Sequence, residues 1–241
     1  MTNELKQKIS DLYDMIFFND GFANKVTGVV NNTNKKVATY PYIGDKYGKS
    51  KKILVVGLDL GQDETPGSIQ SLVDRNSSLK SVHNKMNFHM GGTYFTALYL
   101  LKESLGYNDF YDLTKNETIF NTIIKRHIND LPSENPLDYI CLTNFFKYVT
   151  VNREDRRGDF DRHNIDPNLR EIELFLSEIK ILDPEIIFLQ SMDFNKEWFK
   201  SILDKILVDN RQIIIGYHPS KALPKLKYPE YYFKDYCISI N

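Results

Sequence analysis

The sequence contains few cysteines, no long apolar run and no marked excess of charge. Its two cysteines, Cys141 and Cys237, lie far apart in 241 residues and have apolar neighbours. This spacing favours two buried thiols in a reducing compartment over a disulfide framework. No stretch reaches the length of a membrane span, and the first residues lack the pattern of a secretion signal. We therefore expect a soluble cytoplasmic protein that does not act at a membrane.

The balance of acidic and basic residues excludes a strongly basic, histone-like protein. The chain has 31 basic and 32 acidic side chains and a net charge of −1. Any nucleic-acid surface must therefore be a local patch.

The histidines do not indicate a metal site. Four of them, at positions 83, 89, 127 and 163, show no ligand spacing with cysteines or acids. We therefore expect no metal site and no cofactor.

The chain does contain four apolar runs that alternate with helical patterns. The expected strands are residues 53–58, 137–143, 185–190 and 212–216. Alternation of this kind is typical of a parallel sheet covered on both faces. We predict a single α/β domain, residues 1–241, built as a three-layer α/β/α sandwich around a four-stranded parallel sheet.

Helical spacing predicts the covering layers. Amphipathic patterns occur at residues 5–18, 119–128, 167–182 and 194–207, and Gly91-Gly92-Thr93 marks the entry to a further helix. In the helix at 167–182, one apolar face is expected to carry Leu169, Ile172, Leu176 and Ile179. Residues 1–39 are expected to form an N-terminal helical extension of the domain.

Polar residues follow three of the expected strands. Asp59 follows the first strand, Asn144 the second, and His218 the fourth. Because the carboxyl ends of parallel strands meet at one edge, where ligands bind, we expect the three side chains to share a pocket. For each residue a simpler role stays open, because aspartate and asparagine commonly form turns and a loop histidine commonly serves as a hydrogen-bonding group.

Four motifs in order carry a resemblance to a known family. They are Gly57-Leu-Asp-Leu-Gly61, Leu142-Thr-Asn-Phe-Phe-Lys147, Asp183-Pro-Glu-Ile-Ile-Phe188 and His218-Pro-Ser220. Their order and spacing resemble the uracil-DNA glycosylase superfamily, and most of all its iron–sulfur (family 4) branch. The resemblance covers residues 40–226.

The sequence also departs from that family. The iron–sulfur branch uses four cysteines, whereas here Tyr148 follows Lys147 and only two cysteines exist, so we expect no cluster. Asp59 resembles the acidic residue of the classical uracil excision enzymes. Those enzymes place a tyrosine that blocks 5-substituted pyrimidines where this chain has Gly61. An open pocket floor is therefore expected.

The resemblance implies a role for each motif residue. Asp59 would stabilise the oxocarbenium-like sugar and position a water, and His218 would donate a hydrogen bond to the base as it becomes anionic. Asn144 would read the Watson–Crick edge of a flipped base, and Phe88 would stack on it. Phe88 packed simply in the core is the alternative.

The resemblance also implies residues that line the base pocket and residues that contact DNA. Gly57, Leu58 and Gly61 would line the base pocket. Ser220, Lys221 and Lys225 would contact DNA phosphates, and Leu223, or else Leu226, would fill the gap left by the flipped base.

The resemblance therefore implies a monofunctional DNA glycosylase, which acts as a monomer on single- or double-stranded DNA. Uracil is the default substrate, in base-excision DNA repair. One alternative is excision of a bulky phage-type modified cytosine in anti-phage defence, which rests on Gly61. Others are a non-catalytic binder of DNA or a damaged base on the same fold, and a nucleotide- or sugar-processing α/β enzyme. The missing glycine-rich phosphate loop counts against the last.

Overall fold

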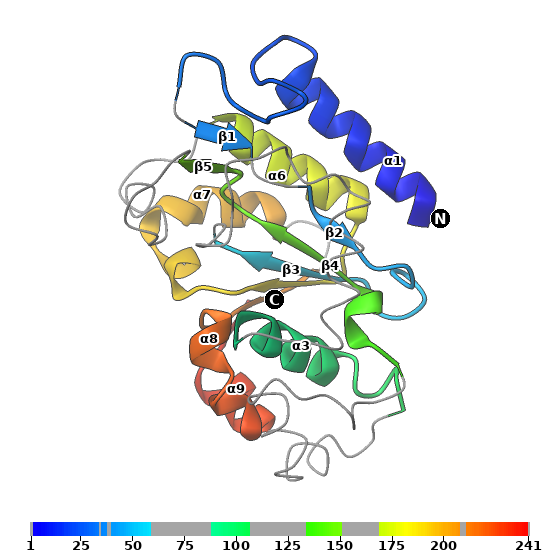
Figure 1. Ribbon diagram of the computed structural model, residues 1–241. Coiled ribbons are helices and arrows are strands. Elements are labelled where there is room, and N and C mark those ends of the chain that lie inside the picture. Colours follow the sequence, from blue (N-terminus) through cyan, green and yellow to red (C-terminus); the bar gives the residue numbers. More distant parts are fainter. Residues whose placement is uncertain are drawn as a thin grey trace.

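The computed structural model describes residues 2–33, 35–37, 40–58, 88–106, 134–150, 169–207 and 211–240. A central sheet separates two layers of helices (Figure 1). The α/β class and the helices on both sides of the sheet agree with the sequence-based prediction. The helix expected at residues 119–128 lies outside the described residues.

The sheet is larger than predicted and is mixed. Its strands lie in the order β2-β4-β3-β6-β7-β8. The four inner strands, β4, β3, β6 and β7, are parallel and are the four that the sequence predicts, whereas the two edge strands are antiparallel to their neighbours. The prediction of a four-stranded parallel sheet is corrected to six strands: β2 (Tyr42–Ile43), β3 (Ile53–Gly57), β4 (Ile140–Asn144), β6 (Ile186–Leu189), β7 (Gln212–Ile215) and β8 (Ile238–Ile240).

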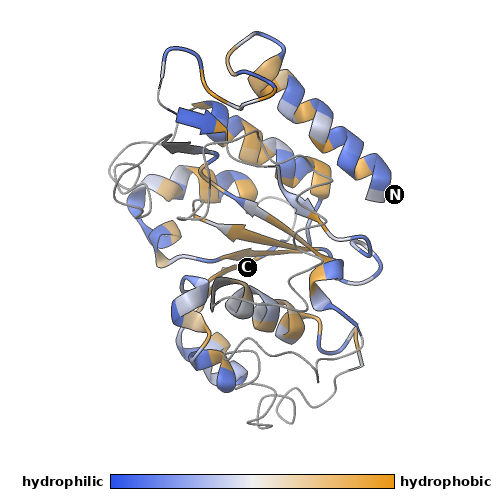
Figure 2. Cartoon of the chain, viewed as in Figure 1, coloured by the Kyte–Doolittle hydropathy of each residue, from blue (hydrophilic) through white to orange (hydrophobic). Residues whose placement is uncertain are grey.

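The inner strands are apolar because both of their faces are buried. Figure 2 shows them as the most hydrophobic part of the fold. Along β3, Leu54 and Val56 join the core on one side of the sheet, and Ile53 and Val55 join the core on the other. Continuous burial of this kind is usual for parallel strands covered by helices.

One helical layer contains the N-terminal segment. It consists of α1 (Thr2–Tyr13), which continues as a π-helical turn (Asp14–Phe18), α6 (Leu169–Leu182) and α7 (Glu197–Ile206). Ile9, Tyr13 and Phe17 are fully buried there, and α1 packs on α6. The N-terminal helix is therefore part of this core layer. A small antiparallel sheet of β1 (Lys35–Val37) and β5 (Tyr148–Thr150) adjoins it.

The other layer combines α3 with the segment after the last parallel strand. Each short helical element of that segment follows or begins with a proline, whose fixed φ suits a helix start. None of these elements was predicted from the sequence. The layer consists of α3 (Phe88–Leu100), η3 (Pro136–Tyr139), α8 (Pro219–Ala222), η6 (Lys225–Lys227) and α9 (Pro229–Asp235).

The predicted inner face of α6 is confirmed in part, because Ile179 is buried and Ile172 and Leu176 pack against the core. Leu169, however, is 82% exposed, and the buried face also includes two glutamates, Glu171 and Glu178. The predicted face contained neither glutamate, and both carboxylates accept hydrogen bonds from buried partners. The full set of buried residues on α6 is Glu171, Leu174, Phe175, Glu178, Ile179 and Leu182.

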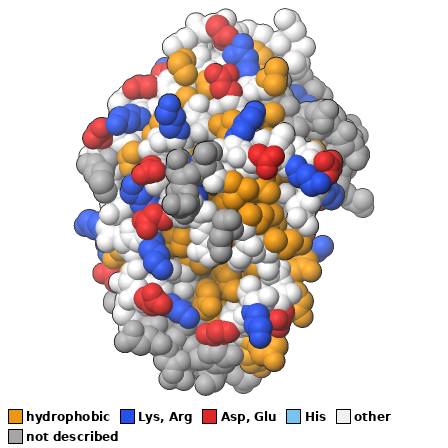
Figure 3. Space-filling model, turned by 180° about the vertical axis from the view of Figure 1, so that it is seen from behind, with side chains coloured by type: hydrophobic (Ala, Val, Ile, Leu, Met, Phe, Trp, Pro, Cys, Tyr) orange, Lys and Arg blue, Asp and Glu red, His pale blue; other side chains and the backbone are white. Residues whose placement is uncertain are grey.

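The surface of the molecule carries charges of both signs. On the face seen in Figure 3, acidic and basic side chains alternate around a central group of hydrophobic ones, so neither sign of charge dominates. Cys141 is buried and Cys237 half-buried, and both are free thiols. Among the described residues, no helix has the length and apolar character needed to cross a bilayer.

Candidate functional site

The carboxyl ends of the parallel strands lie side by side. Gly57 pairs with Asn144 at the ends of β3 and β4, and Leu189 pairs with Ile215 at the ends of β6 and β7. The first described helix after β3 is α3, on one face, whereas α7 follows β6 on the opposite face (Figure 1). This reversal between β3 and β6 is the position where open α/β sheets bind ligands.

Asn144 fills the space left by a glycine. A side chain at position 57 would place its Cβ 2.2 Å from Asn144 Oδ1. The chain after β4 then follows β3, because the amides of Phe145 and Phe146 donate to the carbonyls of Gly57 and Leu58, each at 2.9 Å. Gly57 and Asn144, both assigned to the base pocket in the sequence analysis, therefore lie in contact.

Strand alternation also sets the side on which Asn144 lies. The preceding residue, Thr143, faces α6, where its hydroxyl meets Glu178 at 3.0 Å. Successive side chains of a strand point to opposite faces, so Asn144 belongs to the face covered by α3.

A buried polar pair lies at the switch between β3 and β6. Gln190 directly follows β6, and its amide nitrogen and oxygen contact the Thr93 hydroxyl of α3 at 3.1 and 3.2 Å. Both residues are nearly inaccessible to solvent. Because buried polar groups are costly to leave unpaired, this contact fixes α3 against the strand ends.

The His-Pro-Ser turn lies against the same helix. A Cβ at Gly92 would come within 2.3 Å of the Pro219 carbonyl oxygen and 2.8 Å of its Cα. Only a residue without a side chain permits this approach of two backbones. Glycine at position 92 thus brings the turn that carries His218 onto the first turns of α3.

The His218 ring is held by its own turn. Nδ1 lies 2.9 Å from Ser220 Oγ, and the His218 carbonyl accepts the amides of Lys221 and Ala222. The histidine is exposed at the edge of the fold. The contact of the Ser220 hydroxyl with the imidazole limits the orientation of the ring, and the predicted contact of Ser220 with a DNA phosphate stays a prediction.

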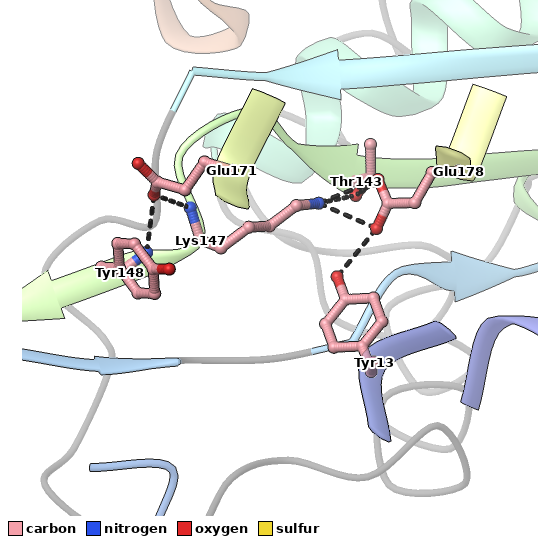
Figure 4. Close-up of polar contacts among 6 residues, drawn as sticks. All are labelled: Tyr13, Thr143, Lys147, Tyr148, Glu171 and Glu178. Carbon is pink, nitrogen blue, oxygen red and sulfur yellow. Dashed lines mark hydrogen bonds and ion pairs between the residues drawn. The ribbon is translucent and has the colours of Figure 1, made fainter. Parts of the chain in front are cut away.

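Behind Asn144 lies a buried ion pair (Figure 4). Lys147 Nζ is 2.9 Å from both carboxylate oxygens of Glu178 and 2.7 Å from the Thr143 hydroxyl. The Tyr13 hydroxyl donates to the same carboxylate at 2.8 Å. Burial lowers the pKa of the Lys147 ammonium, and the Glu178 carboxylate opposes that shift. This cluster joins α1, α6 and β4 directly beneath the Asn144 turn.

The backbone after Asn144 has a second carboxylate partner. Glu171 Oε1 accepts the amides of Lys147 and Tyr148, at 2.7 and 3.2 Å. Residues 144–148 are therefore held by two glutamates of one helix. Charged groups that accept backbone amides in a buried setting hold a turn in one conformation.

Several predicted site residues are not placed by the structure. Asp59 and Gly61 lie outside the described residues, and so does the side chain of Phe88, which begins α3. Leu58 is described and is buried on the α6 side of the sheet. The roles of Asp59, Gly61 and Phe88 stay predictions.

The residues assigned to DNA contact fall into two groups. Lys221 is exposed and Lys225 half-exposed. Leu223 and Leu226 are buried in the core beneath α3, with exposed fractions of 1% and 0%. A wedge between bases needs an exposed side chain, so the structure does not support that role for either leucine.

Sequence reading missed Gln190, Thr93 and Glu178. In the sequence, Gln190 closes an apolar run and Thr93 follows two glycines at the expected entry to a helix, so a polar residue at each expected boundary was the available signal. Glu178 gave a weaker one, since its spacing from Glu171 places both on one helical face.

Comparison of the chain with protein-family models, with curated proteins and with solved structures finds no match in any of the three. Within the described ranges, no group of three histidine, cysteine or acidic side chains is placed to hold a metal ion.

Proposed function

We propose that the protein is a hydrolase that cleaves the N-glycosidic bond of a modified base in DNA. The observation that supports it most is a continuous run of contacts along one edge of the sheet. Asn144 lies on Gly57 of β3, Gln190 of neighbouring β6 holds Thr93 of α3, and Gly92 of that helix meets Pro219. These contacts run from the end of β4 to the His218 turn, which supports the proposal that the Asn144 amide and the His218 imidazole act at one site.

Each side chain matches a need of this reaction. The departing base becomes anionic, and a preorganised donor lowers the barrier most when aimed at that charge. When the Ser220 hydroxyl donates to Nδ1, the proton of neutral His218 resides on Nε2, from which it can be donated to a base carbonyl. Asn144 offers one donor and one acceptor, which matches the edge of a pyrimidine.

The proposal assigns the positive side of the reaction to Asp59. It follows Leu58, whose carbonyl accepts the Phe146 amide beside Asn144. A carboxylate there would stabilise the oxocarbenium-like sugar and orient the attacking water. No metal or organic cofactor takes part in these steps.

Uracil is the first substrate to test, because the motif resemblance implies it. Purified protein is incubated with oligonucleotides that carry one uracil, hypoxanthine, hydroxymethylcytosine or glucosylated cytosine, and abasic sites are counted after alkaline strand cleavage. We expect abasic sites at one or more of these bases. Cleavage of uracil alone would retire the alternative of bulky phage-type bases, and abasic sites at none of the four would contradict the proposal.

A further inference from the structure

An open groove lies next to the His218 turn. It has a volume of about 560 Å³ and is lined by Lys225, Tyr228, Tyr231, Tyr232 and Tyr236. We refer to it as the tyrosine groove. Its lining residues lie in η6, in α9 and at the two positions that flank α9, and α9 lies close to α8 in Figure 1.

The groove has several exposed aromatic rings close together, which is uncommon on a solvent-facing surface. Tyr228, Tyr231 and Tyr236 have exposed fractions of 52%, 65% and 41%. In the described ranges, the other large hydrophobic side chains so exposed lie on other segments: Met15, Val26 and Leu169. Exposed apolar groups that cluster mark a binding surface, whereas scattered ones need no explanation.

A lysine lies among these rings. Lys225 Nζ is 4.1 Å from the ring centre of Tyr236 and 5.8 Å from that of Tyr217. Residues 217–240 carry four lysines and two acids, although the whole chain has a net charge of −1. One of the acids, Glu230, lies 3.9 Å from Lys102 of the α3 layer. The groove thus combines π faces with local positive charge.

The groove and the histidine turn form one unit. The Tyr217 amide, one residue before His218, donates to the Tyr232 hydroxyl at 3.2 Å. Tyr232 is fully buried, and Gly216 leaves room for it, since a Cβ there would lie 2.6 Å from that hydroxyl. The rings of Tyr217 and Tyr236 are 6.1 Å apart, so aromatic surface continues from the groove to the site.

We propose that the tyrosine groove binds single-stranded DNA, with unpaired bases stacked on Tyr228 and Tyr231 and the backbone near Lys225. Rings combined with basic side chains are the features by which proteins hold single strands without reading sequence. Placing the strand beside the target nucleotide rests on the proposed function. It makes single-stranded DNA the preferred substrate over duplex.

The test measures binding and does not need turnover. A fluorescent, unmodified oligothymidylate and a duplex of equal length are titrated by anisotropy into wild-type protein, Tyr231→Leu and Tyr231→Phe. Leucine removes the π face and phenylalanine keeps it. Leu169→Ala, at an exposed site on α6, is the matched control. Because Tyr231 is 65% exposed, its replacement is expected to leave folding intact.

We expect the wild type to bind the single strand more tightly than the duplex. Tyr231→Leu is expected to weaken that binding about 5- to 100-fold, whereas Tyr231→Phe and Leu169→Ala bind like the wild type. Equal affinity of the wild type for both DNAs, or an unchanged affinity of Tyr231→Leu, would overturn the proposal. A wild type that ignores DNA and binds a proline-rich peptide would overturn it as well.

The two proposals fail separately. If single-strand binding depends on Tyr231 but no base is released, the proposal for the tyrosine groove stands and the proposed base excision is contradicted. If bases are released but the affinity for single-stranded DNA does not change in Tyr231→Leu, the proposed base excision stands and the proposal for the tyrosine groove is contradicted.

Discussion

Glycine at position 57 leaves the space that the Asn144 amide occupies, which gives a test at the scale of one residue. In Gly57→Ala the new Cβ meets only the end of a rotatable side chain, Asn144 Oδ1. The side chain can turn away at little cost, so we expect the free energy of unfolding to change by less than about 1 kcal/mol. Loss of one hydrogen bond to the base is expected to lower kcat/KM about tenfold.

Glycine at position 92 is the informative comparison. There a Cβ meets the backbone of Pro219, which cannot rotate away. Gly92→Ala is therefore expected to lose about 1–3 kcal/mol of stability as well as activity. Urea unfolding and steady-state kinetics separate the two variants. An unchanged kcat/KM in Gly57→Ala would show that Asn144 does not contact the base.

At this scale, the sequence indicates which strand ends lie side by side but not how the residues there are held. Gly57 and Asn144 end the neighbouring parallel strands β3 and β4, and the ends of parallel strands lie at one edge, so their proximity could be foreseen. The partner of Lys147 could not. Glu178 lies on a different element with the composition of an ordinary surface helix, and only the packed fold shows that it is fully buried.

At the scale of elements, the Lys147–Glu178 pair joins α6 to the end of β4. Removing one member leaves a buried charge without a partner, which typically costs about 3–5 kcal/mol. We expect that loss for Lys147→Met and less for the double variant Lys147→Met/Glu178→Gln. The glutamine oxygen can still accept the Tyr13 hydroxyl, and the pair leaves no charge without its partner.

Urea unfolding of the wild type, both single variants and the double variant measures this coupling. Lys6→Met is a control, because Lys6 makes an ion pair with Asp45 at the surface. It is expected to change stability by less than about 1 kcal/mol. A double variant that loses the sum of the two single losses would contradict the view that the pair acts as one unit.

Elements also differ in how well the sequence predicts them. The four inner strands are runs of apolar, mostly β-branched residues, and the predicted ranges match the observed strands closely, except at the start of β4. The edge strands β2 and β8 have two and three residues. Such short segments show no periodicity, and their pairing, for example Ile214 with Ser239, exists only in the folded sheet.

At the scale of the molecule, the charge distribution limits how DNA can bind. Acidic and basic side chains alternate on the face in Figure 3, so no broad positive field covers it. A DNA contact therefore has to be local, and the segment after His218 offers both lysines and exposed rings. Binding that depends on a few side chains should depend less on salt than binding to a polybasic surface.

The central proposal is that Asp59 and His218 act on one sugar–base bond. The direct measurement is the single-turnover rate of abasic-site formation, in oligonucleotides with one modified base, for wild type, Asp59→Asn and His218→Ala, with DNA affinity measured in parallel. We predict rates about 100- to 1,000-fold below wild type at unchanged affinity. A wild type that binds DNA but forms no abasic sites, or variants that release the base as fast as wild type, would contradict the account.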